Sequence, residues 1–376
     1  MEKEFLYGLN KEEIRELLQK NLLSQKYIAD QIWDWIYNKG VKRFDEMTNL
    51  SRNLQEKLKD IFFITSPNLK EELMSSDGTC KWLLDLSNKS IDQNFEDSYF
   101  LNKRYSISSQ NIETVYIPDY TRSTVCVSSQ IGCALSCSFC HTGTQKLVRN
   151  IRTDEIISQV LFTKTAINDW RNKRAKLTNI VFMGMGEPFL NYDSVEKAIL
   201  ILCDDKGLNI SRKKITVSTS GIIPGIIQCA DNLRVKLAVS LHSPDDSIRN
   251  EIVPINKKYP IKDLLNACKY YAEKTNNERI TFEYVMLDGV NDSDSDAYHL
   301  ISILKDIPAK INIIPFNPWP NSKYSCSDEK RINSFANIME SGRYFCSIRK
   351  PRGQDIMGAC GQLRSNSEKI LLKNDT

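Results

Sequence analysis

From residue 122 onward, short apolar segments rich in β-branched side chains alternate with amphipathic segments. The apolar segments cover residues 123–129, 179–186, 214–221, 235–242, 279–287 and 310–318. The amphipathic segments have helical spacing and cover residues 153–166, 194–205, 223–232, 261–274 and 296–307. This alternation predicts a parallel sheet covered by helices. Six strand–helix units are too few for a complete eight-stranded barrel, so we expect an α/β fold with a partial (β/α)6 barrel. An open doubly wound sheet is the alternative.

The first 120 residues carry a different pattern. Residues 9–23 keep helical spacing behind Asn10, a candidate N-cap with Glu13 three residues later. Two more helical patterns follow at 27–40 and 49–62, and strand-like patterns appear at 79–87 and 112–119. We therefore divide the chain into a small N-terminal helical accessory domain (1–75), a strand-containing connector (76–121), the partial barrel (122–320) and a C-terminal extension (321–376).

Composition narrows the function classes only slightly. The chain of 376 residues has a formal net charge of +4, a mild basic bias that permits an RNA partner without demanding one. No stretch approaches ~18 uninterrupted apolar residues, so we expect no membrane span. The charged N-terminus does not resemble a signal peptide. Eleven cysteines without an export signal predict reduced thiols and a cytoplasmic protein.

Three of the cysteines, Cys133, Cys137 and Cys140, follow the spacing C-x3-C-x2-C directly after the first predicted barrel strand. A structural zinc ion normally takes four ligands, and Cys126 or His141 could supply the fourth. Three thiolates also suit a 4Fe–4S cluster that keeps one iron open for a small molecule. The spacing therefore predicts a metal centre at the carboxyl end of the strand, with the cluster favoured over zinc.

Glycine and polar residues, with one leucine among them, also stand at the ends of the later predicted strands, where each polar residue alone could be a turn residue. They are Gly186, Glu187, Ser218, Ser240, Leu241, His242 and Asn317. The carboxyl ends of parallel strands meet at one edge of a sheet, so these residues should gather around the metal centre.

With these motifs the chain resembles the radical S-adenosylmethionine (SAM) enzymes, and within them the bacterial dual-specificity adenine-C2 methyltransferases of 23S rRNA and tRNA. The resemblance covers about residues 113–363. The matching stretches read ETVYIP, CVSSQIGCALSCSFC, MGMGEP, STSG, SLHSP, EIVPINKKYPI, EYVMLDGVND, KINIIPFNP and DIMGACGQL. Pro188, Pro315 and the stretch 349–353 favour the C2 branch over the related C8 branch. The chain departs from the family pattern at Pro351 and at 357–358, which puts a substrate loop in question.

The resemblance implies a 4Fe–4S cluster on the three cysteines and SAM on the strand-end residues, with two SAM molecules used per turnover. Adenine C2 is electron-poor, so the family works through a methylated cysteine. By resemblance Cys360 first accepts a methyl group from one SAM. A radical derived from a second SAM then takes hydrogen from this methyl group, and the resulting carbon radical adds to C2. Cys126, expected to be a low-pKa thiol, attacks the sulfur of Cys360 and leaves a transient disulfide. Glu113 matches the proton acceptor, for which burial near the site would raise the pKa.

The implied partners are 23S rRNA, in its peptidyl-transferase region, and tRNAs, at the adenosine 3′ of the anticodon. An external one-electron donor is implied, and we expect a monomer. The N-terminal helices loosely fit the family's RNA-binding module. Among basic stretches, the loop 143–152 with Lys146, Arg149 and Arg152 is the first candidate for RNA contact.

Two alternatives remain open on the sequence. One is an adenine-C8 rRNA methyltransferase that confers antibiotic resistance, and the other is a non-catalytic iron–sulfur or zinc protein that binds RNA. Cys360 and Cys126 distinguish the methyltransferase from the second alternative, because a protein that only binds RNA needs neither cysteine.

Overall fold

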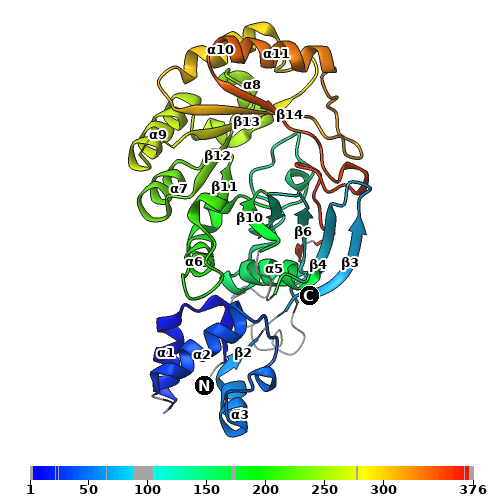
Figure 1. The fold of residues 1–376 in the computed structure, drawn as a ribbon. Helices are drawn as coiled ribbons and strands as arrows, with labels where there is room; N and C mark the ends of the chain where they lie inside the picture. The colour runs from blue at the N-terminus through cyan, green and yellow to red at the C-terminus, as the bar shows by residue number, and fades with distance from the viewer. Residues whose placement is uncertain are drawn as a thin grey trace, which may run out of the picture.

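The computed structural model describes residues 3–21, 23, 25–64, 66–87, 105–107, 109–170, 175–276, 278–367 and 369–371. Its central feature is a ten-stranded sheet with the strand order β15-β14-β13-β12-β11-β10-β7-β6-β4-β3 (Figure 1). The six predicted barrel strands are all present, as β7 (Ser123–Cys126), β10 (Leu177–Phe182), β11 (Ile215–Thr219), β12 (Lys236–Ser240), β13 (Ile280–Met286) and β14 (Ala309–Pro315).

These six strands pair in parallel and in the order in which they occur in the chain. A doubly wound sheet needs a point where the strand order reverses, and none exists here, so that alternative is wrong. Successive crossovers of one hand place all the helices on one face. They are α5 (Thr153–Ala166), α6 (Tyr192–Leu202), α7 (Ile223–Gln228), α8 (Asp246–Ile252), α9 (Ile261–Lys274), α10 (Asp294–Leu304) and α11 (Glu329–Ser341). The predicted partial barrel is confirmed.

Side-chain alternation along the strands separates the core from the barrel interior. In β11, Ile215 and Val217 are fully buried, whereas Thr216 and Ser218 are only half-buried and belong to the opposite side of the strand. Ser218 lines the interior pocket described below, so the half-buried side of the strand is the inner one. Apolar residues thus hold the helices to the sheet, while polar ones are left free to face the interior.

The sheet extends beyond the prediction at both edges. On one side β6 (Asn111–Ile117), β4 (Cys80–Asp85) and β3 (Asn68–Met74) add antiparallel strands. On the other, β15 (Phe345–Ile348) pairs in parallel with β14. The sequence of β3, NLKEELM, favours a helix by composition, but all of it except one residue is exposed, so pairing with β4 determines its structure. Part of the predicted connector, residues 88–104, lies outside the described residues.

The N-terminal helices are α1 (Lys11–Lys20), α2 (Lys26–Tyr37) and α3 (Arg52–Ile61). The predicted capping box is confirmed: the Asn10 backbone N–H donates to the Glu13 carboxylate (2.7 Å), and the Glu13 N–H donates to the Asn10 side chain (3.0 Å). Glu13 also pairs with Lys197 of α6 at 2.8 Å, which ties this helical part to the barrel. Among the described helices, none combines the length and the apolar character that crossing a membrane requires.

Candidate active site

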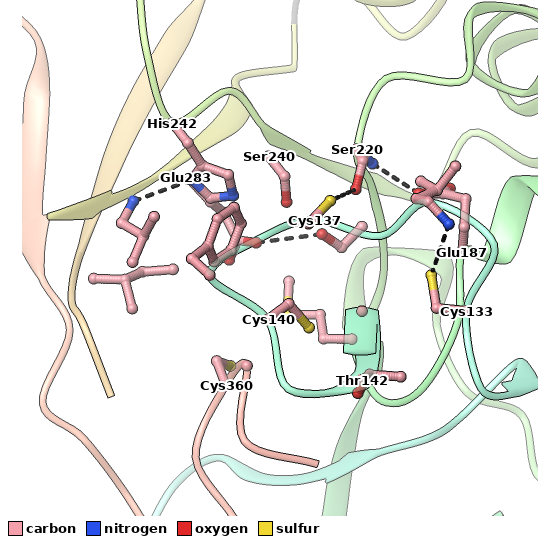
Figure 2. A pocket seen from close by; sticks show the side chains of 18 of the residues that line it. Cys133, Cys137, Cys140, Thr142, Glu187, Ser220, Ser240, His242, Glu283 and Cys360 are labelled. Carbon is pink, nitrogen blue, oxygen red and sulfur yellow. Dashed lines mark hydrogen bonds between the residues drawn. The ribbon is translucent and has the colours of Figure 1, made fainter. Parts of the chain in front are cut away.

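At the carboxyl ends of the parallel strands lies a pocket of about 910 Å³, counting the space at its open mouth. It gathers Cys133, Cys137, Cys140, Gly186, Glu187, Ser218, Ser240, His242, Asn317 and Cys360 (Figure 2). Residues separated by up to 227 positions therefore meet in one place, as the strand-end rule predicts. The Leu241 side chain is fully buried and does not line the pocket, so it could meet a ligand only through its backbone.

The three cysteines stand on one tight loop after β7. The Leu135 N–H donates to Cys133 Sγ at 3.5 Å, and Cys137 Sγ lies 3.9 Å from the Ser220 hydroxyl. A Cβ on Gly143 would lie 2.5 Å from the Cys137 carbonyl oxygen, so the loop requires glycine there. Burial raises the pKa of the Cys133 thiol to about 12. Thiols in such a site become thiolates only with a strong positive charge beside them, which an iron–sulfur cluster provides.

The set of thiols in the pocket bears on the zinc alternative. A structural zinc ion normally takes four ligands. Neither of the two candidates for a fourth ligand, Cys126 and His141, lines this pocket. Three thiolates suit a 4Fe–4S cluster that keeps one iron open, so the pocket favours the cluster.

Glu187 forms the wall of the pocket where β10 ends. Its carboxylate accepts hydrogen bonds from the N–H groups of Ser220 (2.8 Å) and Phe189 (3.2 Å), and its own N–H donates to the Gln130 side chain (2.8 Å). Burial raises the pKa of Glu187 to about 7. Gly186 has φ +95°, and a Cβ there would lie 2.5 Å from Gln130 Cβ. The turn thus presents a fixed carboxylate that an ammonium group of a ligand would keep ionised.

Two further side chains of the pocket, Asn317 and Glu283, have an oxygen atom that can accept a hydrogen bond from a ligand. Asn317 donates through Nδ2 to the Cys360 carbonyl (3.1 Å), but its buried Oδ1 has no hydrogen-bond partner among the described residues. The same is true of Glu283 Oε1, whereas Glu283 Oε2 accepts from the Ser218 hydroxyl (3.2 Å). His242 accepts from the Val285 N–H through Nδ1, and burial lowers its pKa to about 3, so it is neutral. Because Nδ1 of the neutral ring is the acceptor, its Nε2 carries the proton and can donate. Carboxylate and amide acceptors together with this donor suit a ligand with N–H and O–H donors and acceptor atoms, as SAM is.

Cys360 lies on a loop of the C-terminal extension and lines the same pocket as Cys140, next to which it appears in Figure 2. The loop is bonded to the cysteine loop: the His141 N–H donates to the Gly361 carbonyl (2.7 Å), and Gln145 Nε2 donates to Ser365 Oγ (3.0 Å). His141 also stacks on Trp319, with ring centroids 4.9 Å apart. These bonds fix Cys360 beside the three cysteines.

Behind Cys360 is a second cavity of about 490 Å³, the side chamber, which Cys126, Cys360 and Arg349 all line. The two thiols that the sequence linked therefore share one space. The expected low pKa of Cys126 is wrong, however, because burial raises the pKa of this thiol to about 12. Sequence reasoning also missed Arg349 and Glu283. The signal for Glu283 was a carboxylate in an apolar strand, and Arg349 was treated only as part of the stretch 349–353 that favours the C2 branch.

Glu113 is on β6 and lines neither cavity. Its carboxylate pairs with Lys81 (2.8 Å) and accepts from the Arg364 N–H (2.7 Å), four residues beyond Cys360. Burial raises the pKa of Glu113, as expected, although Lys81 opposes the change.

Two of the arginines in the first candidate loop for RNA contact are engaged within the protein. Arg149 pairs with Glu155 at 2.7 Å, and Arg152 pairs with Asp154 at 2.9 Å. Lys146 of the same loop is exposed. All eleven cysteines are free thiols in the structure.

A partial barrel with three cysteines on its first loop and acceptors at the next strand ends defines a radical SAM enzyme. In agreement, residues 127–301 match the model of the radical SAM superfamily, and residues 5–64 match the ribosomal RNA large subunit methyltransferase N-terminal domain. Relatives named dual-specificity RNA methyltransferase RlmN include one from Rhizobium leguminosarum bv. trifolii, 47% identical over 98% of this chain and 90% of its own length. Another, from Rhodopseudomonas palustris, is 46% identical over 98% of this chain and 91% of its own.

A solved structure is also similar over nearly the whole chain. The crystal structure of a radical SAM methyltransferase from Sphaerobacter thermophilus has a TM-score of 0.86 and 39% identity, covering 96% of this chain and 99% of that one. The chain belongs to the family of dual-specificity RNA methyltransferases, and it is a SAM-dependent radical enzyme with a 4Fe–4S cluster.

Proposed function

We propose that the chain methylates C2 of an adenosine in the peptidyl-transferase region of 23S rRNA and of the adenosine 3′ of the anticodon in tRNAs. The observation that carries this proposal is the place of Cys360. Its side chain borders both the pocket of the three cysteines and the side chamber that contains Cys126. A protein that only binds RNA has no use for two thiols arranged in this way, which argues against that alternative.

In this proposal Cys133, Cys137 and Cys140 hold the 4Fe–4S cluster, and the strand-end residues hold SAM. Glu187 faces the SAM ammonium, while Ser218, Ser240, His242 and Asn317 provide further polar contacts, with Gly186 and the Leu241 backbone shaping the wall. When bound, cluster and SAM together supply a 5′-deoxyadenosyl radical. The chain's own task is to place its reactive sulfur beside that chemistry and to exclude water from it.

Cys360 accepts a methyl group on its sulfur and carries the carbon to C2 of the adenine. Cys126 then releases the product by attacking the sulfur of Cys360. An S–S bond forms and the C–S bond of the adduct breaks; its electron pair goes to the carbon, which takes up a proton and becomes the methyl group. The cysteine pair is thereby oxidised, so a thiol reductant must restore it. Glu113 is the proposed acceptor for the C2 proton, supported by its raised pKa and its bond to the Arg364 backbone.

The partners follow from the same chemistry. The target base must leave its stack to reach Cys360, as in other enzymes that modify bases. We propose that residues 1–75 are the accessory RNA-binding domain, 76–121 a connector, 122–320 the catalytic barrel and 321–376 the extension that carries the methylated cysteine. We also propose an external one-electron donor and a monomeric state. A cytoplasmic location is proposed as well, and the eleven free thiols support this location.

The test is to identify the methylated base. The protein is reconstituted anaerobically with iron and sulfide and given SAM, a reductant and either an unmodified 23S rRNA fragment or tRNA. The RNA is then digested, and the methyladenosine isomer is identified by chromatography and mass spectrometry. We expect 2-methyladenosine from the wild type and from Cys346→Ala, which removes a half-buried cysteine of β15, and none from Cys360→Ala. 8-Methyladenosine would assign the chain to the resistance branch, and full turnover by Cys360→Ala would refute the cysteine route.

A further inference from the structure

The side chamber contains a cation that no step above uses. Arg349 directly follows β15, and its backbone N–H donates to the Ile313 carbonyl of β14 at 2.8 Å. This extension of the β14–β15 pairing holds the residue at the edge of the barrel, where it lines the chamber with Cys126 and Cys360. Its side chain is 29% exposed, so the chamber keeps it accessible to a reacting group.

Glu283 lies beside the guanidinium group. Arg349 Nη1 lies 3.7 Å from Glu283 Oε1, which is beyond hydrogen-bond distance, and that oxygen has no hydrogen-bond partner. Glu283 Oε2 is engaged by the Ser218 hydroxyl. The carboxylate therefore weakens the field of Arg349 without forming a hydrogen bond to it, and much of the positive charge stays available to the chamber.

The chamber contains few other charges. The charged or titratable groups that act on Cys126 are Arg349, Cys360 and Glu283. Of these three Arg349 favours the thiolate, and a hydrogen bond from the Met183 backbone adds to its effect. Arg352 also lines the chamber, but its guanidinium group donates to Asp77 Oδ2 (3.0 Å) and to the Pro118 carbonyl (3.1 Å). Among the described residues, Arg349 is thus the cation through which the protein can compensate for the burial of Cys126.

We infer that Arg349 is a positioning residue that stabilises the Cys126 thiolate for its attack on the sulfur of Cys360. The inference rests on the proposed function, since the attack is its product-release step. In that step the negative charge leaves Cys126 as the S–S bond forms, and the electron pair of the broken C–S bond goes to the product carbon with a proton. A guanidinium group suits this place because it remains charged at every pH at which the protein is folded.

The inference makes opposite predictions for two variants. Arg349→Met removes the cation and should make Cys126 less reactive at a given pH. Glu283→Gln removes the neighbouring anion and should make it more reactive. Arg349→Lys should restore most of the wild-type behaviour, and Lys350→Met, the adjacent exposed cation, should change nothing. A purely structural role for Arg349 would not displace the pH dependence in opposite directions in the two variants.

The experiment measures the reactivity of Cys126 in the reconstituted holoenzyme, without RNA. The probe is methyl methanethiosulfonate, a small neutral thiol reagent, and labelling is followed by peptide mass spectrometry from pH 7 to 10. A nearby opposite charge is worth about one to three pKa units, so Arg349→Met should label Cys126 at least tenfold more slowly than the wild type. Absorbance of the cluster and the melting temperature establish that each variant is intact.

Equal labelling rates in the wild type and an intact Arg349→Met would overturn the inference. If Arg349→Met does not fold, Glu283→Gln decides, and a rate at or below that of the wild type would overturn it. Because labelling needs no RNA, this result is independent of the proposed function, which fails only if the wild type makes no 2-methyladenosine.

Discussion

Replacing Lys81 by methionine tests the buried ion pair that holds the proposed proton acceptor. Lys81 Nζ lies 2.8 Å from Glu113 Oε1, and the two side chains are only 10% and 7% exposed. Removing one partner of a buried pair costs about 3–5 kcal/mol, because the other charge stays buried without compensation. Removing an exposed lysine costs at most about 1 kcal/mol. Lys59→Met is the matched control, since Lys59 pairs with Glu56 at 2.7 Å with 44% and 70% exposure.

The loss should depend on pH with a defined sign. Without Lys81, the pKa of Glu113 rises further above its unfolded value, so the folded state binds the proton more tightly than the unfolded state does. Stability is then retained at low pH and lost as the pH rises through the folded pKa. Lys81→Met should therefore lose more at pH 8 than at pH 5, and Glu113→Gln added to it should remove this pH dependence.

The assay is urea unfolding at both pH values, followed by circular dichroism. The expected loss at pH 8 is about 3–5 kcal/mol for Lys81→Met and under ~1 kcal/mol for Lys59→Met. Losses of the same size in the two variants, or a loss that is larger at pH 5, would refute the reasoning.

Three further predictions concern stability and are checked by thermal melting. Gly186→Ala should lower the free energy of unfolding by about 1–3 kcal/mol, because the residue has φ +95° and its Cβ would lie 2.5 Å from Gln130 Cβ. The control, Gly289→Ala, should cost less, because Gly289 has φ +65° and open space around it. Equal losses in the two variants would show that the contact with Gln130 does not matter. Lys236→Gln should raise the melting temperature at pH 7, because burial and neighbouring cations lower the pKa of this lysine. That gain should vanish as the pH rises toward the unfolded pKa of lysine, about 10.4, and a loss of stability at pH 7 would refute it. Asn10→Ala should cost about 1 kcal/mol through the lost capping box, whereas an unchanged melting temperature would show that the cap contributes nothing.

The barrel and most of its site were predictable because both follow from local pattern. Apolar runs separated by amphipathic ones identify parallel strands, and the ends of parallel strands meet. Edge strands such as β3 and β15 were missed because their residues are exposed or half-buried, so these strands lack the apolar signature. Alternation could have placed Leu241: Ser240 and His242 line the pocket, so the residue between them points away.

The pairing of Arg349 with Glu283 could not be predicted in the same way. The two residues lie 66 positions apart, Glu283 on β13 and Arg349 directly after β15, and the register of β13, β14 and β15 brings them together. The raised pKa of Cys126 has a similar origin. It depends on how completely the surrounding strands and the Cys360 loop cover the thiol, which is a property of the assembled fold.

The attachment of the Cys360 loop has a consequence for the order in which the enzyme is made. Cys360 follows every strand of the barrel in the chain, and it is placed by bonds from His141 and Gln145 to residues 361 and 365. During synthesis the N-terminal parts of a chain emerge and fold first. A growing chain can therefore form the three-cysteine loop long before it possesses the thiol that accepts the methyl group. A truncated messenger RNA would yield a barrel without Cys360, the thiol that accepts the methyl group. Carbon transfer can therefore begin only after synthesis has passed the last strand.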